Sequence, residues 1–190
     1  VLFRSLGDLL ALAKAKPGEL NYATAGVGSF QHLSSALFKL QSGLDIVHIP
    51  FKGGGPAMAD VVAGNTQIVI GSLIQMLPQI NSGRLKILGV GSPKRVPALP
   101  NVPTISEAGV PGYEATNWWG VVAPAGTPRP VIERLHKELS VILATSETKK
   151  RFETEGGEAV QMSSDDFGKF IVAETAKWAK VVKETGIKPE

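Results

Sequence analysis

The sequence contains no cysteine among its 190 residues, so a disulfide, a thiol nucleophile and a zinc–thiolate site are all excluded. No apolar run approaches the ~20 residues that a membrane-spanning helix requires, and we expect no direct insertion into a membrane. The net charge is only +3, and the Lys and Arg residues are spread along the chain. The one basic triplet, residues 149–151, is typical of a solvated helix face. Without a basic stripe and stacking aromatic residues, the chain does not resemble a nucleic-acid-binding protein.

The sequence also lacks an initiator methionine and a signal peptide. Residues 1–5 run abruptly into a helical pattern, which we interpret as an artificial or truncated start. The missing signal peptide therefore says nothing about localisation. The length fits one domain or a domain plus part of another, and 43% hydrophobic with 19% charged residues is an ordinary globular balance.

Two glycine-rich turns are the most informative feature that is present. The first lies within residues 22–33 and the second within residues 49–60, and each runs from an expected strand into an expected helix. Glycine lets the backbone come close to a ligand, and a helix N-terminus presents unpaired N–H groups and partial positive charge. The pair predicts a cleft that holds a carboxylate or a phosphate.

The first half of the chain alternates apolar runs of strand length with helical periodicity. The expected strands cover residues 20–24, 46–51, 66–71 and 85–91, and the expected helices cover residues 6–16, 30–41, 57–63 and 74–81. Ser29 is the expected N-cap of the second helix, and Pro56 is the expected first residue of the third. This rhythm is typical of an α/β protein with a mostly parallel sheet covered by helices.

The alternation of strand-like and helical patterns ends after residue 92. Residues 93–111 carry five prolines and predict a long extended loop with one helical turn at 104–108. The remaining expected strands are at 113–122 and 158–162, and the remaining expected helices are at 131–143, at 145–155 and from Ser163 to Gly186. Thr127 is the expected N-cap of the first of these helices, and Ser163 and Asp166 are spaced like a capping box at the start of the last. A boundary is expected near residues 112–120. Since residues 121–190 supply about two strands for three helices, we expect them to pack on something absent from this chain, and the helices of 131–187 to expose apolar faces.

Each glycine turn has two interpretations. Gly26 to Ser29 can cradle an anion with backbone N–H groups and the Ser29 hydroxyl, or can be a tight turn that simply needs glycine. Lys52 to Gly55 can bring the backbone and a positive charge to a ligand, or can be a flexible connector. Neither motif is a dinucleotide fingerprint or a P-loop.

Other candidate residues favour structural roles. Ser29 and His32 have the spacing of a nucleophile and base but no orienting acid, so helix capping is favoured. His32, His48 and His136 fall on separate elements, and we expect no metal and no cofactor. Trp118 and Trp119 fit a cleft lining or a core at a strand crossing equally well, and Trp178 is expected in the core.

The ordered set of segments at 26–33, 49–60, 99–109, 111–114, 119–128 and 177–182 resembles the substrate-binding receptors of tripartite tricarboxylate transporters, the Bug or TctC family. The resemblance runs from about residue 6 to residue 187. It implies an α/β periplasmic binding protein of type II, the Venus-flytrap kind, with one complete lobe and part of the other. Residues 1–18 would be a linker helix, 19–115 the second lobe and 116–190 the C-terminal part of the first lobe, with about two-fifths of the family's length missing upstream.

The resemblance also implies a function. Such receptors are periplasmic, are not enzymes, bind a small carboxylate between the lobes and deliver it to the membrane permease subunits of the transporter. The ligand-binding residues carried over are Ala25, Gly26, Val27, Gly28, Ser29, His32, Phe51, Lys52, Gly53 and Gly54. Tyr is commoner in the family at the position of Phe51. Two alternatives stay open, an α/β enzyme that binds a phosphate-containing substrate at these turns and a sensory receptor.

Overall fold

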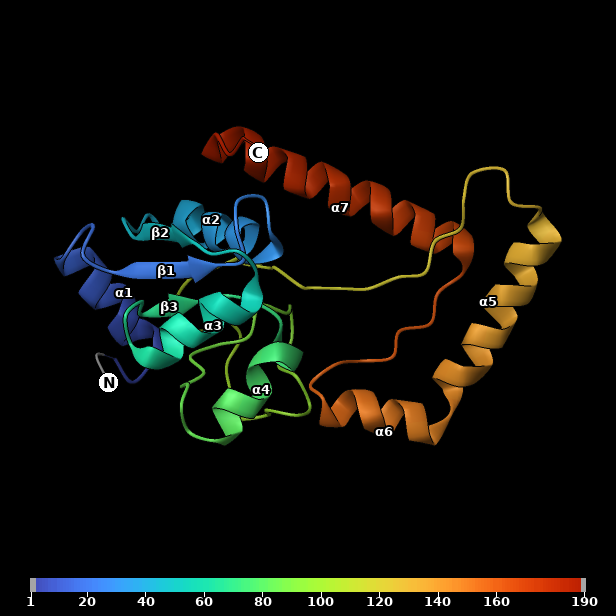
Figure 1. Ribbon diagram of the computed structural model, residues 1–190, viewed down its shortest axis with the longest axis horizontal. Helices are drawn as coiled ribbons and strands as arrows, with labels where there is room; N and C mark the ends of the chain where they lie inside the picture. The colour runs from blue at the N-terminus through green and yellow to red at the C-terminus, as the bar shows by residue number, and fades with distance from the viewer. Residues whose placement is uncertain (1–2, 189–190) are drawn as a thin grey trace.

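The computed structural model describes residues 3–188, which form a parallel α/β body followed by three C-terminal helices (Figure 1). The elements in chain order are α1 (Leu6–Ala15), β1 (Asn21–Thr24), α2 (Phe30–Ser42), β2 (Val47–Pro50), α3 (Gly54–Ala63), β3 (Ile68–Val69), α4 (Leu73–Asn81), α5 (Arg129–Ala144), α6 (Ser146–Thr154) and α7 (Ser164–Thr185). This order of elements confirms the predicted α/β class.

The sheet has the strand order β2-β1-β3, and both strand pairs are parallel. Tyr22 in the central strand pairs with His48 on one side and with Ile68 on the other. Parallel neighbours need a crossover connection, and α2 and α3 supply the two crossovers. Consequently, the carboxyl ends of all three strands lie at one edge of the sheet.

The helices begin and end largely where local chemistry requires. Ser5 and Asp8 form a complete capping box at α1, and the side chains of Ser29, Thr145 and Ser163 cap α2, α6 and α7. The predicted cap at Thr127 is wrong. The N-cap of α5 is Pro128, because the Thr127 hydroxyl donates a hydrogen bond to the Pro124 carbonyl at 2.8 Å and closes the preceding turn instead.

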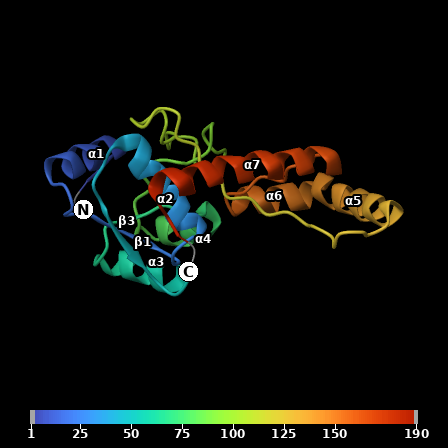
Figure 2. The ribbon, with the colours of Figure 1, turned by 90° about the horizontal axis from the view of Figure 1, so that it is seen from above.

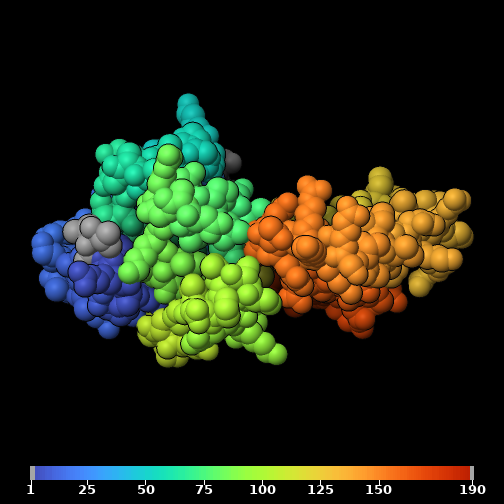
Figure 3. All heavy atoms as spheres, turned by 90° about the horizontal axis from the view of Figure 1, so that it is seen from below, coloured from blue at the N-terminus to red at the C-terminus, as the bar shows by residue number. Residues whose placement is uncertain are grey.

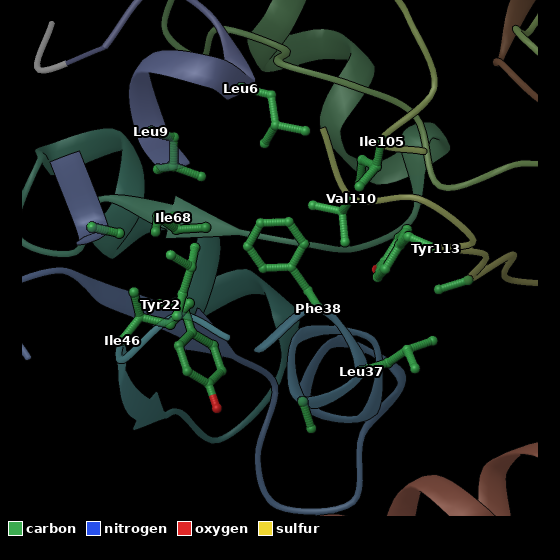
Figure 4. Close-up of a cluster of buried hydrophobic side chains, with 14 of the residues drawn as sticks. Leu6, Leu9, Tyr22, Leu37, Phe38, Ile46, Ile68, Ile105, Val110 and Tyr113 are labelled. Carbon is green, nitrogen blue, oxygen red and sulfur yellow. The ribbon is translucent and has the colours of Figure 1, made fainter. Parts of the chain in front are cut away.

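The main hydrophobic core lies between the sheet and the helices α1 and α2. Phe38 of α2 is 1% exposed and points into the centre of this cluster, with Leu9, Ile68, Val110 and Tyr113 around it (Figure 4). A smaller cluster of Ala23, Ala57 and Val61 joins the opposite face of the sheet to α3. Burying each large side chain stabilises the fold by roughly 1.5–3 kcal/mol, which makes the sheet a rigid support for the loops at its edge.

The last helix returns to this body. The C-terminal half of α7 packs against α2 (Figures 1 and 2), and Trp178 packs edge-on against Phe30 with ring centroids 6.1 Å apart. Val181 is buried in the main core and Trp178 packs against it, as expected. The N-terminal part of α7 is less buried, because Phe167 and Phe170 are only half-buried and pack on Trp118.

Three expected strands are not formed, and the expected strand at 66–71 is shortened to Ile68 and Val69. Among the described residues, 113–122 and 158–162 pair with no neighbour, and 85–91 contributes only a single bridge between Val90 and Thr104. An apolar alternating pattern becomes a strand only when another strand satisfies its backbone hydrogen bonds. The apolar pattern of these segments was therefore misleading, because the described residues give them no strand partner.

The C-terminal helices expose apolar side chains, as predicted. One stripe of α5 leaves Val131, Leu135, Leu139 and Ile142 between 37% and 54% exposed. The segment that leads from the α/β body to α5 is still more exposed to solvent: Val121 is 71% exposed and Val122 is 75% exposed. Figure 3 shows the region of α5 and α6 as a mass beside the α/β body rather than on top of it.

Candidate functional site

Three helix N-termini meet the carboxyl edge of the sheet. β1, β2 and β3 end at Thr24, Pro50 and Val69, and after short turns α2, α3 and α4 begin. In open α/β sheets, ligands bind outside the carboxyl ends of the strands. The sequence analysis found the first two turns and missed the third, formed by Ile70, Gly71 and Ser72. A Ser after an apolar run and a Gly is an N-cap signal that could have revealed it.

The first turn is held by the hydroxyl group of Ser29. Its Oγ donates a hydrogen bond to the Gly26 carbonyl at 2.7 Å and accepts one from the His32 N–H at 3.2 Å. Gly26 and Gly28 have φ angles of +117° and +75°, which residues with a Cβ rarely adopt. The hydroxyl proton of Ser29 is thus used inside the turn, and the N–H groups of Gly26, Gly28 and Ser29 also donate to groups within it.

The two predicted turns lie against each other. The Gly53 N–H donates to the Ala25 carbonyl at 3.2 Å, and the Phe51 N–H donates to the Thr24 carbonyl at 2.9 Å. A Cβ atom at Gly26 would lie 3.3 Å from the Phe51 carbonyl oxygen, so glycine permits this close approach. The turns therefore form one continuous surface.

The remaining predicted site residues surround this contact. Ala25 and Val27 are half-buried, Gly28 is exposed at the tip of the first turn, and Lys52 is exposed beside the second. Phe51 is half-buried and packs against the smaller core cluster, so its ring supports the turn from below. The exposed ammonium group of Lys52 is the one cationic side chain among the ten predicted residues.

The electrostatics of this edge favour an anion. α3 and α4 begin at Gly53 and Ser72 with no side-chain cap, which leaves their first N–H groups without a side-chain acceptor. None of α2, α3 and α4 has an acidic residue in its first turn, whereas α1, α6 and α7 do. No carboxylate side chain therefore occupies the N-termini of α2, α3 and α4, where it would compete with a bound anion.

Gln31 lies among the three turns and was not singled out from the sequence. Its side chain is 5% exposed, and within the described residues its buried Oε1 atom has no hydrogen-bond partner. The Gln31 Nε2 atom would be 3.8 Å from a Cβ at Gly54 and 3.1 Å from a Cβ at Gly71. An unpaired buried acceptor is uncommon in folded proteins. A Gln at the second position of a helix carries no sequence signal for such a role.

His32 and His48 stack behind the first turn, with ring centroids 4.0 Å apart. The Gly28 N–H donates to His32 Nδ1 at 3.2 Å, and Thr24 Oγ1 shares a 2.7 Å hydrogen bond with His48 Nε2. Burial, and then the charge of Lys39, lowers the pKa of His32. Burial, followed by the charges of His32 and Lys39, lowers the pKa of His48 to about 4. Both rings are neutral at pH 7 and buttress the turn.

This arrangement favours the structural interpretation of Ser29 and His32. The Ser29 hydroxyl is bonded to backbone groups rather than to the His32 ring, so no nucleophile–base pair is assembled. Within residues 3–188, no three or more His, Asp or Glu side chains gather as a metal site would require. His136 lies apart, at α5, where its Nε2 is 2.9 Å from the Met162 carbonyl oxygen.

Trp118 and Trp119 lie in different surroundings. Trp118 is 37% exposed and packs edge-on against Phe167 and Phe170 of α7. Trp119 is 66% exposed and lines a cavity of about 540 Å³ between β3 and residues 84–92. None of the ten predicted ligand-binding residues lines this cavity, which is mainly apolar. The cavity therefore touches the edge only at the third turn, where Ile70, Gly71 and Ser72 line it.

No helix in the described part of the chain combines the length and the apolar character needed to cross a bilayer.

Comparison with protein families matches residues 3–187 to the tripartite tricarboxylate transporter family receptor, TctC. The chain therefore belongs to this family, as the sequence motifs indicated. Two curated relatives, one from Pseudomonas sp. strain P51 and the protein BugT from Bordetella pertussis, are each 38% identical over 96% and 97% of this chain. The chain spans 54% and 56% of their lengths.

Solved structures share the fold. R. palustris Rpa4515 with adipate superposes with a TM-score of 0.91 at 36% identity, covering 99% of this chain and 63% of that one. The periplasmic binding protein BugD gives 0.86 at 30% identity, covering 100% and 64%. MatC from Rhodopseudomonas palustris with bound malate gives 0.83 at 28% identity, covering 94% and 62%. The periplasmic-binding-protein fold is confirmed, and the family is one of receptors rather than enzymes.

Proposed function

We propose that this chain is part of an extracytoplasmic solute receptor that binds a small dicarboxylate and releases it unchanged. The observation that carries the proposal is the meeting of three helix N-termini, all without first-turn acids, at one sheet edge. Such an edge favours a carboxylate by backbone N–H donation and by the helix dipole, without a buried cation. Two similar receptors were solved with adipate and with malate, which are both dicarboxylates.

The ligand-binding residues of the proposal are the ten predicted at the two turns, together with the missed third turn. One ligand carboxylate accepts from N–H groups at the starts of α2, α3 and α4. Lys52, exposed at the rim, adds attraction at longer range. Gln31 and Gln75 bring polar side-chain atoms to the start of α3, 3.8 Å and 3.7 Å from the position of a Cβ atom at Gly54.

The second half of the site belongs to the rest of the receptor. We propose that residues 19–115 form one lobe and that residues 116–190 belong to the other, completed by upstream sequence that the longer relatives contain. Closing the lobes over a ligand removes water and strengthens each hydrogen bond in the cleft. Because the ligand binds the closed state better, its binding shifts the population toward closure. A transporter permease recognises that closed form.

The proposed location is the periplasm, and the proposed partners are the small carboxylate and the permease subunits. A periplasmic binding protein, BugD, shares the fold over the whole chain. The family model describes a receptor of the tripartite tricarboxylate transporter. The rival enzyme would need an acid, base or nucleophile at the turns, and the groups there are committed to backbone contacts.

A thermal-shift titration of the complete gene product tests the proposal. The panel contains dicarboxylates of four to six carbons, with ATP and NAD as controls. A dose-dependent rise in melting temperature with an acid, with the acid recovered unchanged, is the expected result. A rise with a nucleotide alone, or conversion of the acid, would overturn the proposal. Co-purification of the protein with a kinase ectodomain rather than the permease would favour the sensory alternative.

A further inference from the structure

The stacked imidazole rings of His32 and His48 are both tied to the first glycine turn. The Gly28 N–H donates a hydrogen bond to His32 Nδ1 at 3.2 Å, and His48 Nε2 lies 2.7 Å from Thr24 Oγ1. Thr24 Oγ1 in turn accepts a hydrogen bond from the Gly26 N–H at 3.3 Å. The pair therefore reaches both glycines of the turn that have positive φ angles, one directly and the other through a buried hydroxyl group.

The hydrogen bond from Gly28 determines where His32 can take up a proton. Because Nδ1 accepts this bond, the neutral ring is assigned the tautomer that carries its proton on Nε2. A second proton can then enter only at Nδ1, where it would face the Gly28 N–H as one donor against another. Protonated His32 is therefore incompatible with the present position of Gly28.

His48 connects a proton to the same turn by a second route. Thr24 Oγ1 accepts from the Gly26 N–H, so its own proton is available for donation to the neutral His48 ring. When His48 is protonated, Nε2 becomes a donor and the Thr24 hydroxyl has to direct its proton elsewhere. The Gly26 carbonyl lies 3.4 Å from Thr24 Oγ1, but it already accepts a hydrogen bond from the Ser29 hydroxyl. A proton on either ring therefore disturbs the hydrogen bonds of the turn.

The packing of the two rings favours the neutral state. Their centroids are 4.0 Å apart and their planes are inclined by only 12°, so a charge on one ring opposes a charge on the other. Burial is the largest cause that lowers the pKa of both His32 and His48. The pair is thus held neutral at pH 7 and takes up its first proton below the usual range of histidine.

The charged and titratable neighbours do not stabilise a proton on the pair. Tyr22 of β1 stacks on His48 with centroids 5.0 Å apart, and the Lys39 ammonium group of α2 lies 5.9 Å from the centre of the Tyr22 ring. On α7, which packs against α2, Glu174 and Lys177 pair with each other at 3.1 Å. The exposed Lys52 after β2 is a further cation. In the described part of the chain, no carboxylate side chain bonds to either ring.

We propose that the His32–His48 pair is an acid-sensitive support of the first glycine turn, and that uptake of one proton by the pair opens the turn and weakens its hold on a carboxylate. The weaker binding rests on the proposed function, whereas the opening of the turn does not. An imidazole that leaves the stack regains its ordinary pKa near 6.5. Each pH unit below this value therefore favours the opened turn by up to about tenfold.

Attraction between a protonated ring and a bound anion acts in the opposite direction. Gly28 and Lys52 are exposed, so this edge of the sheet is open to solvent, and water and salt screen such an attraction. The opposition of two donors at Gly28 is a direct contact that solvent does not screen. We therefore expect the loss of the turn to outweigh the gain in attraction.

An NMR titration of the ligand-free complete gene product tests the opening of the turn. The backbone amides of Gly26 and Gly28 are expected to shift together between pH 6.5 and 4.5, along with the ring signals of the pair, while that of Ala23 in the central strand stays unchanged. His32→Asn should suppress the shift of Gly28, because its amide oxygen can accept from this N–H without titrating. His136→Asn, on α5, is the matched control and should retain the shift. Glycine amides that stay in place down to pH 4.5 in the folded protein would overturn the proposal.

Calorimetric titration at pH 7.5 and 5.0 tests the consequence for binding. The probe is adipate or malate, whichever binds at pH 7.5. The loss of affinity between the two pH values should be at least about threefold larger in the wild type than in His32→Asn. Protonation of the probe affects both proteins equally and cancels in this comparison. If His32→Asn does not fold, His48→Gln is the second variant that does not titrate, since its amide oxygen can accept from Thr24.

The outcomes separate this proposal from the proposed function. An equal loss of affinity in the wild type and the variant would overturn the acid-sensitive support. A smaller loss in the wild type would overturn it too, because attraction of the protonated ring for the anion would then dominate. Failure of every dicarboxylate to bind at pH 7.5 would instead overturn the proposed function, and the glycine amides would still decide whether the turn opens.

Discussion

The N–H group of Gly53 donates a hydrogen bond to the carbonyl oxygen of Ala25, at 3.2 Å. This bond joins two turns that are far apart in the sequence and belong to different β-α connections. It fixes the starts of α2 and α3 relative to each other before any ligand arrives. A binding surface built in this way has little conformational entropy to lose when an anion binds.

Gly26→Ala tests the close approach of the turns. The φ angle of +117° and the 3.3 Å contact with the Phe51 carbonyl oppose a side chain, so we expect a loss of about 1–3 kcal/mol in unfolding free energy. Carboxylate affinity should fall as well. Gly168→Ala on α7, where no atom lies within 4 Å of the added methyl group, should be neutral or slightly stabilising. Chemical denaturation and calorimetric titration of both variants measure the two effects.

Ser29→Asp separates capping from anion binding. Asp keeps the N-cap acceptor but loses the hydrogen bond that the Ser29 hydroxyl donates to the Gly26 carbonyl, so Ser29→Asp and Ser29→Ala should each cost about 1 kcal/mol. The added carboxylate repels the ligand, and affinity should fall at least about tenfold. Thr145→Asp at the distant cap of α6 should leave affinity unchanged. Retained affinity in Ser29→Asp would argue against a carboxylate at this turn.

Gln31→Met tests the unpaired buried amide. The substitution conserves the shape of the side chain and removes an acceptor that has no partner in the described residues, so we expect a gain of about 1 kcal/mol in unfolding free energy. Gln75→Met, at an exposed position on α4, should change stability little. A loss of stability in Gln31→Met, measured by denaturant titration, would mean that the amide is already satisfied in the free protein.

His48 predicts a pH dependence of stability. The unfolded chain takes up a proton at this ring near pH 6.5, whereas the folded protein does so only near its lowered pKa of about 4. Unfolding free energy should therefore be at its full value above pH 6.5 and fall as the pH decreases through this window. We expect a loss of about 1–2 kcal/mol, because solvent screens a partly exposed ring. His48→Gln should flatten the curve of melting temperature between pH 7.5 and 4.5, and an unchanged curve would contradict the assignment.

Leu135→Gln tests the proposed division into lobes. If the apolar stripe of α5 is covered in the complete receptor, this change should cost at least about 2 kcal/mol there, as expected for a core position. Glu138→Gln, on the same helix outside the stripe, should change stability by less than about 0.5 kcal/mol. The stability of the complete gene product is measured by urea unfolding. Equal, small effects of the two changes would show that the stripe stays exposed.

The helices and the first two turns were predictable because their signals are local. Ser29 as a cap, Gly43 after α2 and Gly64 after α3 each act within a few residues of their own position. The absence of a strand at 85–91 was not predictable from its apolar pattern, since a strand also needs a neighbour that satisfies its backbone hydrogen bonds. The position of Gln31 among three turns was equally inaccessible, because the turns meet only after the sheet has formed.

The contact between Phe30 and Trp178 has a spectroscopic consequence. Phe30 is the first residue of α2, directly after Ser29, and the indole ring of Trp178 lies edge-on to it. Trp178 also donates a hydrogen bond from Nε1 to the Glu174 carboxylate, which makes its emission sensitive to small displacements of the ring. With Trp118 and Trp119 replaced by phenylalanine, Trp178 is the one tryptophan among the 190 residues, and it contacts the residue that follows the cap of the first glycine turn.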